Sequence, residues 1–127
     1  MWHGYEPNVR TALGRIVRDR ELESFWDIGA NNGFYSWLLK TMQPAVQVES
    51  FEPDPRNAAL MRATMHHTHI EGITLNEMAL GDRCGVAQFT FDDVSGMAGC
   101  VTESDQYSLV RTTYGGARTA DVPIFHH

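Results

Sequence analysis

The stretch "DIGANNGFYSW", residues 27–37, decides the fold because an apolar run gives way there to a helical pattern across a glycine loop. The overlapping segment "SFWDIG" (24–29) predicts a short buried strand that ends at Gly29. After Gly33 the apolar residues recur at helical spacing, as Phe34, Trp37, Leu38 and Met42. The segment therefore predicts a strand, a glycine loop and a helix in succession.

The same alternation continues along the chain. "VQVESFE" (46–52) predicts a second strand, and a helix is expected from about Pro55 to His66. "ITLNEMAL" (73–80) and "VAQFTF" (86–91) predict two further strands, whose short spacer indicates an antiparallel pair. An amphipathic helix is expected from Pro7 to about Glu23. This order is typical of an α/β protein with an open, mostly parallel sheet.

Length and composition limit the class of protein. A chain of 127 residues with 43% hydrophobic and 20% charged residues predicts one folded domain. The net charge of −6 argues against a nucleic-acid-binding protein, and we interpret the basic cluster between Arg10 and Arg20 as a solvated helix face rather than a phosphate site. No apolar stretch is long enough to cross a membrane. Cys84 and Cys100 lack metal-ligand spacing, so a cytoplasmic chain with reduced thiols is expected, with a disulfide as the alternative.

The second half of the chain carries weaker signals. Residues 92–116 are rich in Gly, Ser and Thr and predict a long loop. "TADVPIF" (119–125) predicts a last strand, which Pro123 confines to a sheet edge or a strand end. No metal site is predicted, since no carboxylate or cysteine joins the histidines at ligand spacing and their position suits a helix end. These histidines are His66, His67 and His69.

The glycine loop is the predicted binding site, because ligands of such sheets bind beyond the carboxyl ends of the strands. A dinucleotide site would need G-x-G-x-x-G to seat a pyrophosphate, but this loop reads G-A-N-N-G and follows Asp27. An acidic side chain would repel a pyrophosphate and attract a cation, such as the α-amino group and sulfonium of S-adenosylmethionine. The structural alternative is that Asp27 caps a helix beside an ordinary turn.

Glu52 comes 19 residues after Gly33, at the end of the second predicted strand. A carboxylate at this place accepts hydrogen bonds from both hydroxyls of a ribose. Because NAD carries the same ribose, an NAD-dependent oxidoreductase is an alternative to a protein that uses S-adenosylmethionine. Pro53 and Asp54 either start the next helix or contact the ligand, and the sequence does not separate the two.

Three segments resemble, in order and spacing, the FkbM family of S-adenosylmethionine-dependent methyltransferases: "DIGANNGFYSWLL", "SFEPDPRNAALMRATM" and "ITLNEMALGDRCGVAQFTF". The resemblance covers about Phe25 to Cys100. It implies a Rossmann-like class I methyltransferase sheet and O-methylation of hydroxyls on sugars, glycolipids or macrolide-type metabolites. It also implies three groups of cofactor-binding residues: Asp27, Gly29, Ala30, Asn31 and Gly33 around the amino-acid part, Glu52 at the ribose, and Ala79 and Leu80 near the adenine.

Members of that family usually continue past the variable Gly- and Ser-rich stretch into a strand with a D-x-E-G segment, which does not occur before His127. The expectation is one methyltransferase domain over 1–127, truncated after the variable loop, with an N-terminal helix (1–23), a cofactor-binding half (24–91) and a loop-rich part (92–127). Because a shortened sheet leaves strand edges that pair with other chains, the alternatives are an incomplete cofactor-binding or interaction module and a homo-oligomer. The sequence identifies neither the acceptor nor the general base that a hydroxyl acceptor requires.

Overall fold

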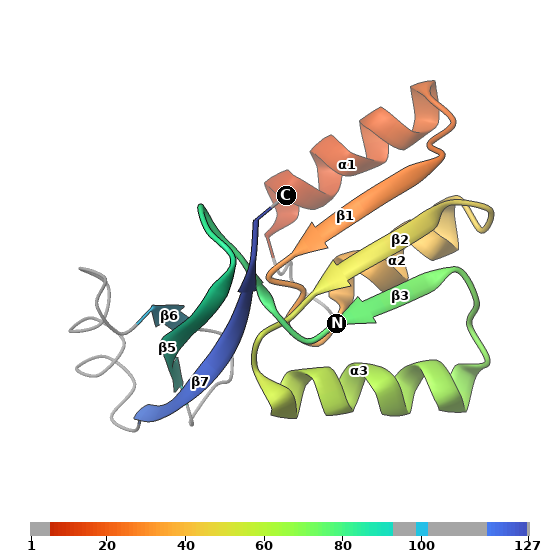
Figure 1. Cartoon of the computed structure of the whole chain (residues 1–127). Helices are drawn as coiled ribbons and strands as arrows, with labels where there is room; N and C mark the ends of the chain where they lie inside the picture. The colour runs from red at the N-terminus through yellow and green to blue at the C-terminus, as the bar shows by residue number, and fades with distance from the viewer. Residues whose placement is uncertain (1–5, 93–98, 102–116, 127) are drawn as a thin grey trace.

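The computed structural model describes residues 6–92, 99–101 and 117–126 (Figure 1). Within these ranges the elements are α1 (Pro7–Asp19), β1 (Ser24–Ile28), α2 (Phe34–Met42), β2 (Gln47–Phe51), α3 (Pro55–Thr68), β3 (Ile73–Asn76), β4 (Ala79–Leu80), β5 (Gly85–Asp92), β6 (Gly99–Val101) and β7 (Ala117–Phe125). The strands form two sheets. Figure 1 shows the second sheet beside the carboxyl ends of β1, β2 and β3.

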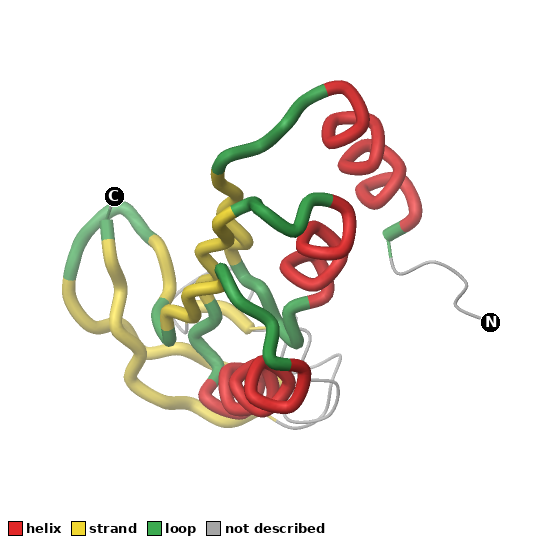
Figure 2. Tube along the Cα trace, turned by 90° about the vertical axis from the view of Figure 1, so that its right-hand side faces the viewer, coloured by secondary structure: helices red, strands yellow, loops and turns green. Residues whose placement is uncertain are grey.

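The first sheet is parallel, with the order β1-β2-β3, and pairs Phe25 with Val48 and Val48 with Ile73. Parallel neighbours need a crossover connection, which α2 and α3 provide. Figure 2 shows the three helices on one side of these strands. On that side Leu39 and Val46 join Val48 and Ile73 in the buried core. The structure confirms the predicted α/β class and the Rossmann-like, parallel arrangement of these strands.

The side chains of β2 alternate between the two faces of the parallel sheet. Val48 and Ser50 are buried on the helix side, so Phe51 points to the opposite face. There the Phe51 ring lies with its centroid 5.5 Å from that of Trp26. Trp26 is still 39% exposed and Ile28 60% exposed, because none of the described helices covers this face. The two faces of the sheet therefore differ in what they pack against.

The second sheet has the order β4-β7-β5-β6 and corrects two expectations. The predicted strand 73–80 is divided between the two sheets, because the chain turns where the Met78 N–H donates to the Asn76 carbonyl oxygen (2.9 Å). The predicted antiparallel pairing of this strand with 86–91 is wrong. Instead β5 pairs antiparallel with β6 and with all of β7 except its last residue, and β4 pairs parallel with the end of β7. The mixed second sheet was not predicted.

The first helix is shorter than expected, since α1 ends at Asp19 and not near Glu23. The side-chain amide of Gln43, which follows α2, explains the difference. It donates to the carbonyl oxygens of Val17 (2.9 Å) and Arg20 (2.6 Å) and so binds the end of α1 in place of a further helical turn. Arg20, which follows α1, has an extended backbone instead.

Pro123 lies within β7, in register with Val86 on β5. On the other side of β7, β4 pairs only with Ile124 and Phe125. Among the described residues this edge of β7 has no strand partner at Pro123, which is also close to the strand end, as expected. The loop expected over 92–116 is wrong where the structure describes it, because Asp92 ends β5 and Gly99–Val101 form β6; the rest of that range lies outside the described residues.

The two glycines at the ends of the glycine loop should respond differently to alanine. Both have a positive φ, +73° at Gly29 and +85° at Gly33, so each substitution carries left-handed strain of about 1 kcal/mol. A Cβ at Gly33 would also lie 2.7 Å from the Trp37 ring and 2.8 Å from the Met61 methyl, whereas nothing lies within 4 Å at Gly29. We expect Gly33→Ala to lower the free energy of unfolding by roughly 1–3 kcal/mol more than Gly29→Ala in urea titrations. Equal losses would contradict the close packing at Gly33.

Candidate functional site

The glycine loop joins β1 to α2 at the carboxyl end of the parallel sheet. The carbonyl oxygen of Phe51, the last residue of β2, accepts the N–H groups of Gly29 (2.9 Å) and Ala30 (3.0 Å). Gly29, Asn31 and Gly33 have φ values of 73°, 55° and 85°. Glycine tolerates this left-handed region, and asparagine is one of the few other residues that adopt it readily. The loop therefore has a tight shape that is anchored to the end of β2.

Asp27 lies just before this loop and is 6% exposed. Its Oδ2 accepts the backbone N–H (3.0 Å) and the hydroxyl (2.5 Å) of Ser36 in the first turn of α2. The Ser36 and Ser50 hydroxyl oxygens are 2.7 Å apart. Because Ser36 gives its single hydroxyl proton to Asp27, Ser50 is the donor in the second bond. Asp27 thus caps α2, as the structural alternative expects. Its contact with a cofactor stays a prediction.

Glu52 follows β2 and is 5% exposed. Its Oε2 accepts the N–H of Asn31 in the glycine loop (2.6 Å), and its Oε1 accepts the N–H of Asp54 (2.8 Å). The side chain of Asn57 gives a further hydrogen bond. Burial raises the pKa of Glu52 above its ordinary value, while these hydrogen bonds oppose the rise. Glu52 therefore ties the glycine loop to the start of α3.

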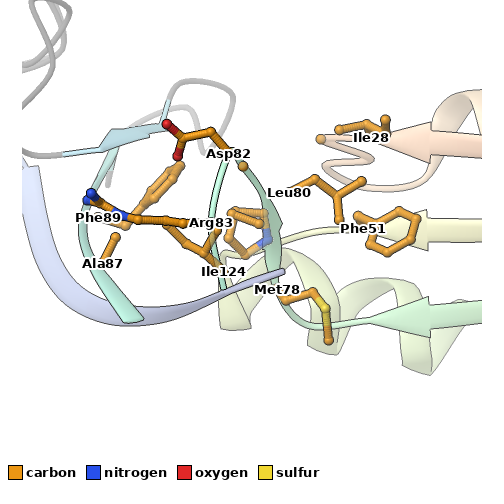
Figure 3. A pocket seen from close by; sticks show the side chains of 13 residues that line it. Ile28, Phe51, Met78, Leu80, Asp82, Arg83, Ala87, Phe89 and Ile124 are labelled. Atoms are coloured by element: carbon orange, nitrogen blue, oxygen red, sulfur yellow. The ribbon is translucent and has the colours of Figure 1, made fainter. Parts of the chain in front are cut away.

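A pocket of about 380 Å³ opens between the carboxyl end of the parallel sheet and the second sheet (Figure 3). One wall consists of Ile28, Gly29, Phe51 and Pro53, the opposite wall of Ala87, Phe89 and Ile124, and residues 78–83 connect the two. The lining is mostly apolar, and its charged members are Asp82 and Arg83. An apolar pocket with few polar groups is the usual form of a small-molecule site.

The structure brings part of the predicted site together at this pocket. Gly29, Pro53, Ala79 and Leu80 line it. The other predicted residues do not line it, but belong to the glycine loop, precede it or bond to it: Asp27, Ala30, Asn31, Gly33 and Glu52. The loop and the pocket are adjacent because Gly29 belongs to both.

Several pocket residues were missed from the sequence. Phe51, at the end of the predicted strand 46–52, lines the pocket. The alternation in "VAQFTF" does place Ala87 and Phe89 on one face of a strand, which is a usable signal for the opposite wall. Ile124 had no signal, because its place depends on the pairing of β7 with β5, two strands far apart in the chain.

The remaining chemistry-bearing side chains do not gather into a second centre in the part of the chain that the structure describes. No group of three His, Cys, Asp or Glu side chains is arranged there as a metal site. Cys84 is an exposed free thiol, and its sulfur accepts the His126 N–H (3.4 Å); the side chain of Cys100 is outside the description. None of the described helices is long and apolar enough to cross a bilayer.

The burial of Asp27 predicts a pH dependence of stability. Desolvation raises its pKa above the ordinary value of 3.8, against the opposing effect of the Ser36 bonds. A carboxyl whose pKa is higher in the folded than in the unfolded state stabilises the fold at low pH, and this contribution is lost as the pH rises through the folded pKa. We therefore expect Asp27→Asn to gain stability relative to the wild type as the pH rises from below 3.8.

Urea unfolding of the wild type and Asp27→Asn at a series of pH values measures this effect. Asp19→Asn, at the exposed end of α1, is the matched control. A stability difference that is constant with pH, or that moves in favour of the wild type as the pH rises, would contradict the raised pKa.

The chain is similar in sequence to a known methyltransferase. No family model matches the chain. One relative, the 31-O-demethyl-FK506 methyltransferase FkbM of Streptomyces tacrolimicus, is 33% identical in an alignment of 119 residues that covers 91% of this chain and 45% of that protein. The chain thus spans less than half the length of this relative.

Among solved structures, the precorrin-6y C5,15-methyltransferase of Geobacter metallireducens superposes with a TM-score of 0.48 and 22% identity, over 58% of this chain and 39% of that one. A likeness of this size does not bear on function. The sequence similarity to FkbM extends along nearly the whole chain, and it confirms that the chain resembles the FkbM methyltransferases.

Proposed function

We propose that this chain forms the cofactor-binding part of an S-adenosylmethionine-dependent methyltransferase, and that the protein methylates a hydroxyl group on a sugar, a glycolipid or a macrolide-type metabolite. The name of the relative describes a methyltransferase that acts on 31-O-demethyl-FK506, which supports an oxygen acceptor. The residues proposed to bind the cofactor are Asp27, Gly29, Ala30, Asn31, Gly33, Glu52, Pro53, Ala79 and Leu80.

The observation that carries the proposal is the open backbone at Gly29 beside the apolar pocket. Apart from Gly29 and its two chain neighbours, no residue has a heavy atom within 4 Å of the place where a Cβ would stand, so a ligand can approach the main chain there. Pro53 and Leu80 line the same pocket of about 380 Å³. A flat aromatic base such as adenine suits a space with one open backbone wall and apolar side chains around it.

The start of α2 favours a cofactor without a pyrophosphate over NAD. A pyrophosphate at such a loop would bind the unpaired N–H groups of the first helical turn. Here the Phe34 N–H donates to Asn32 Oδ1 (3.2 Å) and the Ser36 N–H donates to Asp27 Oδ2 (3.0 Å). Two of the donors that a pyrophosphate would use are therefore already occupied, one of them by a carboxylate.

Glu52 can accept hydrogen bonds from a ribose only at carboxylate positions that its hydrogen bonds within the chain do not already use. A carboxylate has about four acceptor sites, and Asn31, Asp54 and Asn57 use three of them. One hydroxyl of the ribose can bond to Glu52 directly, and the second would take the place of the Asn57 side chain. The expected bond from both hydroxyls thus depends on Asn57 giving way.

The chemistry of the proposed reaction divides between cofactor and chain. S-adenosylmethionine supplies an electrophilic methyl group when it is bound. The chain's own residues bind and orient the cofactor at the carboxyl end of the sheet. Alignment of the methyl group for in-line attack by a hydroxyl oxygen lowers the activation barrier by several kcal/mol, as in other well-oriented reactions. The acceptor hydroxyl must also lose its proton to a general base.

The direct test is calorimetric titration of the chain with S-adenosylmethionine, S-adenosylhomocysteine and NADH in parallel. The proposal predicts saturable binding of the first two and no binding of NADH. Binding of NADH alone would favour the oxidoreductase. A folded chain that binds none of the three would reject the pocket as a cofactor site.

Substitution of Glu52 tests the ribose contact. We expect Glu52→Ala to weaken S-adenosylhomocysteine binding by about one to two orders of magnitude, since hydrogen bonds to a charged group contribute roughly 1.5–3 kcal/mol. Glu52→Gln should lose less, because it keeps one oxygen acceptor. Glu49→Gln is the matched control, because Glu49 lies on β2 three residues before Glu52 and its Oε2 accepts the Asn76 side-chain amide (2.9 Å) rather than the glycine loop. An unchanged dissociation constant in a folded Glu52→Ala variant would remove Glu52 from the site.

A further inference from the structure

The proposed cofactor pocket has walls from two different sheets, so its width depends on how the sheets are held together. Gly29 and Pro53 belong to the first wall, whereas Phe89 on β5 and Ile124 on β7 belong to the second. Residues 78–83 join the walls along the chain. This segment connects the two walls on one side of the pocket. On the other side, side-chain contacts between the walls are needed to keep the pocket from opening.

Arg118, near the start of β7, makes such a bridge. Its Nη2 lies 3.1 Å from Oδ1 of Asp54, which is on the first-sheet side of the pocket. Its guanidinium also lies 4.7 Å from the centroid of the Phe91 ring on β5. Asp54 and Phe91 are buried, at 3% and 2% exposed, so the guanidinium is held between two fixed groups.

Asp54 transmits this contact to the pocket wall. It directly follows Pro53, which lines the pocket, and its backbone N–H donates to Glu52 Oε1 (2.8 Å). Its Oδ1 also accepts the Arg56 N–H (2.9 Å), so the carboxylate caps α3. A displacement of Asp54 would therefore move Glu52, Pro53 and the first turn of α3 together.

We infer that Arg118 is a positioning residue for the cofactor pocket, which it keeps at its working width by holding β7 and β5 against the Glu52–Asp54 segment. The inference rests on the proposed function, since it takes the pocket to be the cofactor site. Arg118 does not line the pocket and acts through Asp54 and Phe91.

Arg56 provides a matched control for the bridge. Its Nη2 lies 3.4 Å from Oδ2 of the same Asp54 carboxylate. Arg56 belongs to α3 and is two residues after Asp54 in the chain, so this ion pair does not cross between the sheets. Its side chain is 49% exposed, against 35% for Arg118. Loss of Arg56 removes a charge partner of Asp54 and leaves the bridge in place.

The experiment compares S-adenosylhomocysteine affinity by calorimetry for the wild type, Arg118→Gln, Arg118→Lys and Arg56→Gln. We expect Arg118→Gln to weaken binding about three- to fivefold, as expected for a partly exposed ion pair, with Arg56→Gln unchanged. Arg118→Lys should fall between them, because lysine keeps the charge but not the planar group over Phe91. Equal effects of Arg118→Gln and Arg56→Gln, or no effect of either, would overturn the inference.

A second measurement needs no ligand and separates this inference from the proposed function. Hydrogen exchange in residues 52–58 should be faster in Arg118→Gln than in the wild type, and unchanged in Arg56→Gln. If the wild type binds no S-adenosylhomocysteine, the proposed function fails, and the exchange pattern alone decides whether Arg118 bridges the sheets. Unchanged exchange in Arg118→Gln would reject the bridge whatever the binding result.

A double-mutant cycle with Asp54→Asn identifies the partner through which Arg118 acts. Asparagine is as good a helix cap as aspartate, so this variant removes the charge and keeps the start of α3. The exchange rates in residues 52–58 should rise no further in the double variant Arg118→Gln/Asp54→Asn than in Arg118→Gln. Additive increases would mean that Arg118 does not act through Asp54.

Discussion

The structure depends on one constraint, which is that the chain must pass from β1 to α2 within residues 29–33 while every buried polar group finds a partner. Burial of the Asp27 carboxylate would cost several kcal/mol without hydrogen bonds. Ser36 supplies two bonds to it, and Ser50 supports the Ser36 hydroxyl. Because Asp27 is on β1, Ser36 on α2 and Ser50 on β2, this cluster fixes three elements around the loop at once.

The same constraint shapes the pocket through Phe51. Its carbonyl oxygen holds the glycine loop by two N–H groups, and its ring lines the pocket and packs against Trp26. The loop therefore cannot move away from the sheet without disturbing the pocket wall. Glu52, the next residue, bonds to the loop at Asn31 and so fixes the other end of the same turn. Backbone geometry and pocket shape are thus coupled at the end of β2.

The parts of the fold that depend on local pattern could be predicted from the sequence. The segments from β1 to α3 follow apolar periodicity, glycine and proline signals, and their order gave the parallel sheet. The second sheet could not be predicted, because the pairing of β5 with β7 joins residues far apart in the chain, such as Gly85 and Ile124. The division of 73–80 escaped prediction for the same reason, since both halves have similar apolar character and only their partners differ.

The candidate site divides along the same line. The glycine loop and Glu52 are visible in the sequence, because backbone conformation and strand ends restrict residue type there. The roles of Ser36 and Ser50 were not visible, because small polar residues within a helix or strand carry no signal until their neighbours in space are known. The opposite wall of the pocket and the bridge from Arg118 likewise arise only from tertiary contacts.

We propose that a cofactor with an adenosyl group binds at the carboxyl end of the parallel sheet, between the glycine loop and the second sheet. Nuclear magnetic resonance of the ¹⁵N-labelled chain, titrated with S-adenosylhomocysteine, locates the ligand residue by residue. We expect the largest amide shifts at Gly29, Ala30, Ala79 and Leu80, with small shifts in α1 and at the carboxyl end of α3. Shifts that gather on the helix side of the sheet, or a spectrum that does not respond to a saturating ligand, would contradict it.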